Sequence, residues 1–302
     1  MPRNAIASAS GSHGVGRALG ILAGLIVSAT PLGVRAGHDV FHIFSPEVEA
    51  GSWGVEALST FQRGLPRHPD GDGHVGHVPV RAGHEIALHS GVTDFWMAKL
   101  ALGLAREDGE SYTATSLALE NVLRLTAAAR GPVDLAWFTA VSAGLESGAT
   151  NAVEFGPIVS FDHGPFAVVL NPFLEKSFGE NRESGIAFAY AVRASYEIAE
   201  RLSVGVEMYG EIENIGNAPP RSEQTHRIGP VLYLGHMHGA RRHLHAPEAV
   251  HGGHHGHAHA ESHGSARGQS AASDWHAEVG VLFGLTQASP DAALKINLGT
   301  DF

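Results

Sequence analysis

The last eleven residues of the chain, 292–302, alternate strictly between apolar and polar side chains. The apolar side holds Leu294, Ile296, Leu298 and Phe302, and the other side holds Lys295, Asn297, Gly299 and Asp301. Successive side chains of a β-strand point to opposite faces, so this pattern predicts a strand with one apolar and one polar face. Such a strand suits a transmembrane barrel, or a soluble antiparallel sheet with one face on a core. How often the pattern recurs decides between the two.

The N-terminal residues predict export. Arg3 and Arg17 precede a short apolar run over residues 18–30, and small residues surround Ala36. A basic N-terminal region, a short apolar centre and small residues at the cleavage site are typical of a secretory signal peptide. The run is shorter than the roughly 17–25 residues of a membrane-spanning helix. We expect a signal peptide over residues 1–36 that is cleaved after Ala36, leaving residues 37–302. The alternatives are an uncleaved anchor and a misassigned start codon.

The composition narrows the classes of protein. The chain has no cysteine, 38 glycines, 17% charged residues and a formal net charge of −11. Without cysteine, a disulfide framework and thiol chemistry are excluded. The acidic balance argues against nucleic-acid binding, which needs a basic face. Beyond the leader, no apolar run could span a membrane as a helix. An exported chain of this kind is either a soluble periplasmic protein or a β-barrel.

Twelve segments of the mature chain show the strand pattern. They are residues 47–62, 83–91, 94–106, 111–126, 133–146, 151–162, 165–178, 185–199, 202–214, 225–235, 274–286 and 292–302. Short connections, such as AERL at 199–202, indicate antiparallel neighbours. We predict an all-β fold, an antiparallel transmembrane β-barrel of about 12 strands. Helix is the alternative for 94–106, 111–126 and 185–199, which are rich in helix-favouring Ala, Leu and Glu.

The polar faces of these segments would line the lumen. Their charged residues are Lys99, Glu120, Arg124, Glu154, Glu175, Arg193, Glu197, Glu207, Glu211, Glu213, Glu278, Lys295 and Asp301. Carboxylates outnumber cations, and rings of carboxylates select cations in pores. An open lumen would therefore favour cations. In the alternative, a plugged barrel, the same charges form salt bridges that only stabilise the protein, because a small lumen can be filled by side chains.

Five aromatic residues lie near segment ends or on the apolar faces. They are Trp96, Trp137, Trp275, Tyr190 and Tyr196. This placement suits the aromatic girdles of a barrel at the two membrane interfaces. Core packing in a soluble β protein is the alternative.

Residues 236–273 form a His-rich, flexible insert between the tenth and eleventh segments. Its ten histidines are His236, His238, His243, His245, His251, His254, His255, His257, His259 and His263. Imidazole is a common ligand of zinc, copper and nickel. No CxxC, HExxH or spaced carboxylate accompanies the histidines, so we expect adaptable metal binding and no preformed catalytic site. The alternative is a linker that binds metal only in vitro. No cofactor is required.

The side of the membrane that the insert faces is open at this stage. If the C-terminus is periplasmic, strand parity places the insert on the periplasmic side and the loop over residues 64–82 outside. Long connections of such barrels usually face outward. Either the insert is a specialised periplasmic loop, or the strand count is off by one.

Three C-terminal stretches carry a family resemblance. They are YEIAERLSVGVEMYGEIENI at 196–215, HRIGPVLYLG at 226–235 and VGVLFGLTQASPDAALKINLGTDF at 279–302. The chain resembles the MetA-type family of outer-membrane proteins labelled for the meta-pathway of phenol degradation. The resemblance covers about the C-terminal third convincingly, and the rest by strand rhythm. It implies an outer-membrane β-barrel and a transport channel. The His-rich insert departs from that pattern and favours metal ions over an aromatic substrate.

The leading hypothesis is therefore an outer-membrane barrel acting as a passive channel or transport component, linked to divalent transition-metal handling. The alternative is a metal-sequestering outer-membrane or periplasmic protein without transport activity. An enzyme is not expected. His89, Ser90 and Asp94 are close in sequence and His276 is near Glu278, but no G-x-S-x-G nucleophile context occurs.

The expected location is the bacterial outer membrane, reached through the cleaved signal peptide. Its partners there would be outer-membrane lipid and the barrel-assembly machinery, engaged through the C-terminal strand that ends at Phe302. Small solutes or metal ions would be its cargo, and nucleic acid would not be a partner.

Overall fold

The computed structural model describes residues 40–64, 80–106, 109–126, 131–146, 149–179, 182, 184–235 and 274–302. All of them belong to one compact unit, residues 31–302. The predicted signal peptide, residues 1–36, and the His-rich insert, residues 236–273, lie outside the described residues.

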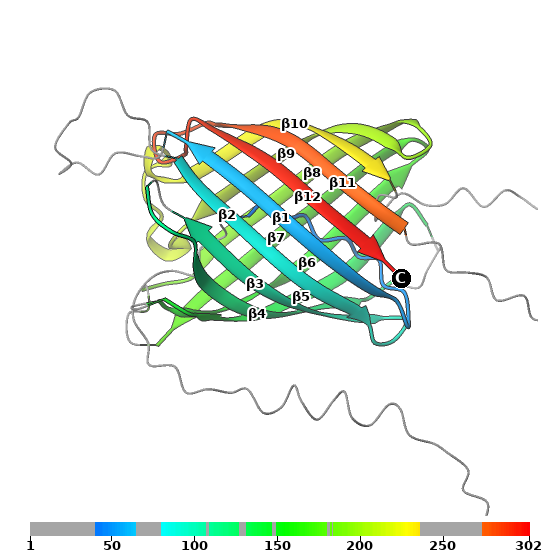
Figure 1. Ribbon diagram of the computed structural model, residues 1–302, viewed down its shortest axis with the longest axis horizontal. Helices are drawn as coiled ribbons and strands as arrows, with labels where there is room; N and C mark the ends of the chain where they lie inside the picture. Colours follow the sequence, from blue (N-terminus) through cyan, green and yellow to red (C-terminus); the bar gives the residue numbers. More distant parts are fainter. Residues whose placement is uncertain are drawn as a thin grey trace, which may run out of the picture. The chain divides into compact units, whose positions relative to one another are not determined.

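The described residues form a closed antiparallel barrel in which each strand pairs with its sequence neighbours and β1 pairs with β12 (Figure 1). The strands are β1 Trp53–Arg63, β2 Val80–Gly91, β3 Trp96–Arg106, β4 Thr113–Arg124, β5 Val133–Gly144, β6 Asn151–His163, β7 Phe166–Phe178, β8 Ala187–Ala199, β9 Leu202–Ile212, β10 Thr225–Gly235, β11 Asp274–Gly284 and β12 Ala292–Asp301. Two short 3₁₀ helices, η1 Ile215–Asn217 and η2 Arg221–Glu223, lie between β9 and β10. The predicted fold class is confirmed, and the segments for which helix was the alternative are strands.

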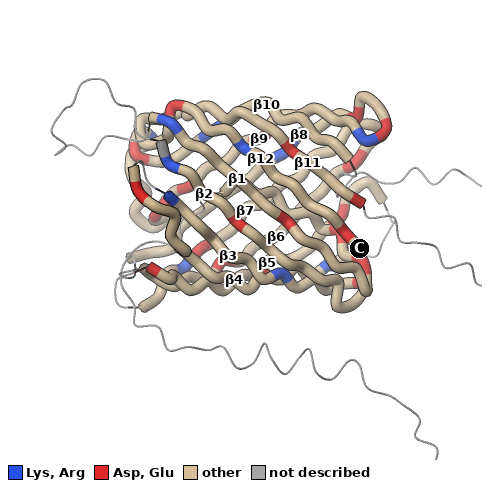
Figure 2. Tube along the Cα trace, viewed as in Figure 1, with Lys and Arg blue, Asp and Glu red and all other residues tan. Residues whose placement is uncertain are grey.

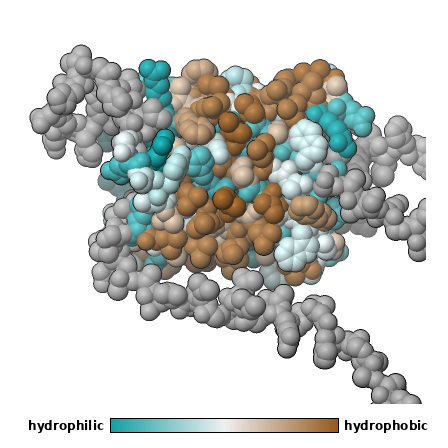
Figure 3. All heavy atoms as spheres, viewed as in Figure 1, coloured by the Kyte–Doolittle hydropathy of each residue, from teal (hydrophilic) through white to brown (hydrophobic). Residues whose placement is uncertain are grey.

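The exterior of the barrel is apolar because each strand alternates. In β4, Leu119 is 49% exposed while its neighbour Glu120 is buried, and in β9, Val206 is 46% exposed while Glu207 is buried. Figure 3 shows apolar side chains gathered over the middle of the visible face, with hydrophilic ones toward the ends. A soluble sheet would bury this face, so the alternation, once closed into a barrel, defines a transmembrane β-barrel. Among the described residues, no helix has the length and apolarity needed to cross a membrane.

The two ends of the barrel differ in their connections. At the terminal end, where β1 begins and β12 ends, β6 and β7 are joined by residues 164–165, and β8 and β9 by residues 200–201. At the opposite end, which we call the loop end, residues 64–79 and 213–224 connect the strands. Gly235 pairs with His276, and Asp274 pairs with Asp301. The chain therefore enters and leaves the His-rich insert at the terminal end, as a count of twelve strands requires.

Several predicted strand boundaries differ from the observed ones, and two of the differences bear on the lumen. Residues 47–52 precede β1 instead of belonging to it. Gly51 has a positive φ of 81°, a conformation that glycine adopts without strain, and the backbone N–H of Ser52 donates to the carbonyl of Glu49. This turn separates β1 from the residues before it. At the other boundary, β9 ends at Ile212, so Glu213 lies beyond the strand and is exposed.

A charge on the outer face should destabilise the barrel. Replacing Val206, in the middle of β9, by arginine should lower the free energy of unfolding by about 2–4 kcal/mol, because the guanidinium would lie in the bilayer. Unfolding by urea of protein refolded into lipid vesicles measures this. Glu213→Arg, beyond the end of the same strand, is the control and should change stability by about 0.5 kcal/mol or less. Equal stability of the two variants would contradict a lipid-facing β9.

Candidate functional site

The lumen of the barrel contains residues 40–49, which we call the lumen segment (Figure 1). Phe41 and Ile43 are 3% and 6% exposed. The backbone N–H of Phe44 donates to Asn171 Oδ1 at 2.7 Å, and Asn171 Nδ2 donates to the Phe44 carbonyl at 3.1 Å. Asn297 Nδ2 donates to the Phe41 carbonyl at 3.1 Å. A carboxamide carries both a donor and an acceptor group, so these inward asparagines satisfy backbone groups of the lumen segment through their side chains.

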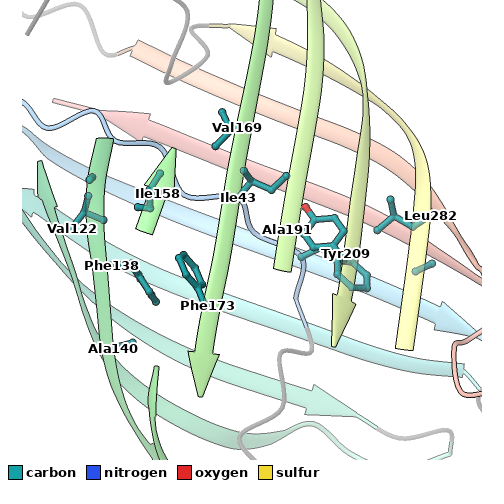
Figure 4. Packing of buried hydrophobic residues seen from close by; sticks show 13 residues of the cluster. Ile43, Val122, Phe138, Ala140, Ile158, Val169, Phe173, Ala191, Tyr209 and Leu282 are labelled. Atoms are coloured by element: carbon teal, nitrogen blue, oxygen red, sulfur yellow. The ribbon is translucent and has the colours of Figure 1, made fainter. Parts of the chain in front are cut away.

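Aromatic side chains fix the lumen segment from both sides. The Phe44 ring centroid lies 4.2 Å from that of Phe138, which is itself 4.6 Å from that of Phe173. Phe41 packs on Tyr209 at 4.9 Å. Figure 4 shows these strand side chains turned inward around the stretch that carries Ile43. The middle of the lumen is therefore an apolar core, where the sequence predicted only a polar lining.

One ion network surrounds Lys99, whose side chain is buried. Its Nζ lies close to three carboxylates, those of Glu56 at 3.0 Å, Glu85 at 3.1 Å and Glu120 at 3.4 Å. The same Nζ lies 3.3 Å from Nδ1 of His42 on the lumen segment. A buried charge is stable only when it is paired, so this network links β1, β2, β3, β4 and the lumen segment around one cation.

A second network surrounds Lys295, which is fully buried. Its Nζ lies 2.7 Å from Glu207 Oε2 and 2.7 Å from Glu278 Oε2. The hydroxyls of Tyr209 and Tyr233 donate to Glu207 at 2.7 and 2.9 Å. Lys295 also donates to the Tyr209 hydroxyl at 3.1 Å. The network crosses β9, β10, β11 and β12 and satisfies each charge with several partners.

The structure places most of the predicted lumen charges on inward strand positions. Buried there are Lys99, Glu120, Glu154, Glu175, Arg193, Glu207 and Lys295, and less fully covered are Arg124, Glu197, Glu211, Glu278 and Asp301. Glu213 is the exception noted above. Outside the two networks, Arg124 lies 3.7 Å from Asp134, and Asp301 lies 2.8 Å from His89. Acidic and basic positions thus recur side by side along the strands (Figure 2).

Sequence reasoning missed the lumen segment and several inward residues. Glu56 lies in the first predicted strand, and its alternation with Val55 and Ala57 was the available signal for an inward carboxylate. The inward apolar core had a signal as well. Alternation lapses where two apolar residues adjoin, as at Trp137 and Phe138, and such a lapse indicates that both faces of the strand meet apolar surroundings.

The lumen segment lies between two cavities. A cavity of about 500 Å³ at the terminal end is lined in part by His42, Phe44, His89, Arg124 and Asp301. A smaller cavity of about 110 Å³ is lined in part by His42, Phe44, Glu120, Tyr209 and Arg227. Some of these lining residues lie nearer the loop end. Because His42 and Phe44 line both, the segment forms the partition between them.

The residues considered for an enzyme do not converge. His89 pairs with Asp301, while the Ser90 hydroxyl donates to the Ser52 carbonyl. His89 and Ser90 are adjacent in β2 and point to opposite faces. Asp94 is exposed in the turn after β2. Within the described part of the chain, no group of three or more His, Asp or Glu side chains is placed to hold a metal ion. The ten histidines of the insert lie outside the described residues.

The comparisons with known proteins support the fold. No protein-family model and no curated protein matches the sequence. The COG4313 outer membrane channel from Pseudomonas putida F1 is similar in structure, with 12% identity and a TM-score of 0.54, over 86% of this chain and 98% of that chain. The NanC porin matches at 7% identity and a TM-score of 0.46, over 82% and 98%. The translocator domain of the autotransporter NalP from Neisseria meningitidis matches at 9% and 0.44, over 84% and 88%.

At such low sequence identities, the comparisons show similarity of fold alone. The TM-scores of the second and third structures are too low to support any further conclusion. The class that emerges is an outer-membrane-type β-barrel of twelve strands. The resemblance to the MetA-type family stays a prediction.

The Lys295 network gives a stability prediction. Lys295→Met should lower the free energy of unfolding by about 3–5 kcal/mol, because the fully buried Glu207 would lose its cation and Glu278 would keep only Arg193 as a cation, at 3.8 Å. Urea unfolding in vesicles, followed by tryptophan fluorescence, measures it. Lys176→Met, at an exposed outward position of β7, is the matched control, with an expected change of about 1 kcal/mol or less. Wild-type stability of Lys295→Met would show that the network is not a structural element.

Proposed function

We propose that the protein is an outer-membrane passive channel of narrow bore, which the lumen segment holds closed in the conformation described. The observation that carries this proposal is the partition of the lumen by His42 and Phe44 into two cavities. A barrel serving only as an anchor needs no cavities on both sides of a separate internal segment. No catalytic role is proposed.

The lumen segment is attached differently from a strand. Neighbouring strands share ladders of backbone hydrogen bonds, whereas the bonds at Phe41 and Phe44 come from the side chains of Asn171 and Asn297. Displacing the segment breaks fewer bonds than displacing a strand, and the barrel itself remains closed. The segment is therefore the element whose movement would join the two cavities.

The charges of the lumen favour cations. Lys99 is outnumbered by its three carboxylates, and Lys295 by two. Glu154 and Glu175 are register partners on β6 and β7 and add two further inward carboxylates. A lumen with an excess of carboxylates attracts cations and repels anions. Small cations, divalent transition metals among them, are the proposed cargo.

The His-rich insert links this cargo to metal handling. Both ends of the insert, at Gly235 and Asp274, are at the terminal end of the barrel. Asp274 and His276, just after the insert, line the larger cavity. Binding of zinc, copper or nickel by the insert would concentrate metal beside this opening. The second candidate function, metal sequestration without transport, rests on the same insert and differs in requiring no conductance.

The location and partners complete the proposal. Export by a signal peptide over residues 1–36 delivers the chain to the outer membrane, with the terminal end periplasmic and the loop end outside. The apolar outer face meets lipid there. The barrel-assembly machinery engages the last strand, which ends at Phe302. Membership of the MetA-type family would agree with a transport channel.

Loosening the lumen segment should raise conductance. Asn171→Ala removes both hydrogen bonds to Phe44, so single-channel recordings in planar bilayers should show more frequent or larger openings than the wild type. Asn121→Ala is the matched control, because Asn121 accepts a hydrogen bond from Trp96 and faces outward on β4. In a KCl gradient, the reversal potential should indicate preference for K⁺. Absence of conductance in the wild type, in Asn171→Ala and in a variant lacking residues 37–46 would refute the channel.

Removing the insert should separate the two functions. A variant lacking residues 239–264 should lose most zinc and copper binding in titration calorimetry, while its conductance and its heat-dependent gel shift stay at wild-type values. The control replaces His68, His74 and His77, in the loop after β1, by glutamine and should leave metal binding unchanged. Metal binding that survives the deletion would place the metal site elsewhere.

A further inference from the structure

The charges on the outer face of the barrel are distributed unevenly. By strand alternation, the charged side chains that face outward from the described strands are Arg63, Arg106 and Lys176. All three are basic and exposed. Arg63 and Arg106 are the last residues of β1 and β3, and Lys176 is near the end of β7, so all three lie at the loop end. Carboxylates at this end, such as Glu110 and Asp291, lie in the connections.

Arg106 belongs to a cluster that crosses three strands. Its guanidinium lies over the ring of Tyr112, 4.9 Å from the centroid. The Tyr112 hydroxyl lies 3.0 Å from Nε2 of His84, whose Nδ1 lies 2.9 Å from the Ser59 hydroxyl. A cation–π contact uses the face of the guanidinium and leaves its N–H edge directed elsewhere. The cluster therefore holds Arg106 in position without consuming its donors.

The surface next to the cluster is apolar. On the same outer face, toward the middle of the barrel, Ile86 and Leu88 follow His84 along β2, and both are exposed. Leu100 is exposed on the adjacent strand β3. A ligand that covers this surface must have acyl chains for the leucines and isoleucine and an anionic group at the height of Arg106.

We propose that the outer face around Ser59, His84, Arg106 and Tyr112, with Arg63 beside it, binds a phosphorylated glycolipid of the lipid A type in the outer leaflet. A guanidinium matches a phosphate by two parallel N–H···O bonds. Tyrosine with a basic residue at the edge of an apolar band is the usual composition at lipid headgroup level. The acyl chains of the glycolipid lie along Ile86 and Leu88.

The choice of leaflet rests on the proposed outer-membrane location with the loop end outside. The binding site itself does not, because it is defined by side chains on the barrel wall. A measurement in detergent micelles therefore tests the site separately from the location, and membrane fractionation tests the location.

The experiment uses the mature protein in neutral detergent, with diphosphoryl lipid A as the probe and native mass spectrometry as the measurement. Arg106→Gln should weaken binding about tenfold, as expected for loss of a hydrogen-bonded charge pair, and Arg106→Lys should weaken it less. Arg201→Gln, which removes an exposed arginine at the terminal end, is the matched control and should bind as the wild type does. Heat-dependent gel shift verifies that each variant is folded.

Four results would overturn the proposal. Wild-type affinity of Arg106→Gln would exclude the cluster, and equal weakening by Arg201→Gln would show attraction to net charge alone. Equal binding of fully dephosphorylated lipid A would show that acyl chains suffice. Displacement of lipid A by micromolar inorganic phosphate would indicate a free-phosphate site instead of a lipid site.

Discussion

The backbone pairing of β12 with β1 is the constraint on which the rest of the structure depends. It runs in register from Gly54 with Asp301 to Arg63 with Ala292. In a bilayer, an open sheet edge would leave backbone N–H and C=O groups without partners, at a cost of several kcal/mol for each group. Closure removes both edges, and it also assigns every strand side chain to one of two environments, lipid outside or the lumen inside.

The two environments demand different solutions. The outside takes leucine, valine and aromatic side chains with little specificity, because lipid has no fixed shape. The inside is narrow, and the charges there must be paired once water is excluded. Lys99 and Lys295 each gather carboxylates from several strands, so one network joins β1 to β4 and the other joins β9 to β12.

The space between the networks is filled by the lumen segment. Phe41 and Phe44 pack on inward aromatic residues, and inward asparagines satisfy the backbone. This combination of apolar packing with a few side-chain hydrogen bonds explains how a segment outside the sheet is ordered without joining it. The same arrangement makes the segment the element that can move while the barrel persists. The function proposed for the protein rests on this difference: backbone hydrogen bonds hold the strands together, whereas side-chain hydrogen bonds hold the lumen segment.

The fold could be predicted because a strand with one lipid face must alternate, and alternation is visible in a single sequence. Lys295 and Glu207 could be assigned to the lumen for the same reason. Glu213 could not be assigned correctly, because the alternation continues past the end of β9 and only pairing with a neighbour ends a strand. The partners of each charge were also beyond reach, since alternation gives the face of a residue and not the strand opposite.

The sequence by itself determined the number of strands, which residues of each strand face inward and which face outward, and the presence of a His-rich connection between β10 and β11. Each of these follows from local periodicity and composition. Only the tertiary structure decided that the lumen is divided by residues 40–49 and that Lys99 and Lys295 are each shared among several strands. The physical reason is that these features join residues that the curvature of the barrel brings together in the lumen. Neither the period of a strand nor its composition records which residues of other strands, or of the lumen segment, a side chain will meet there.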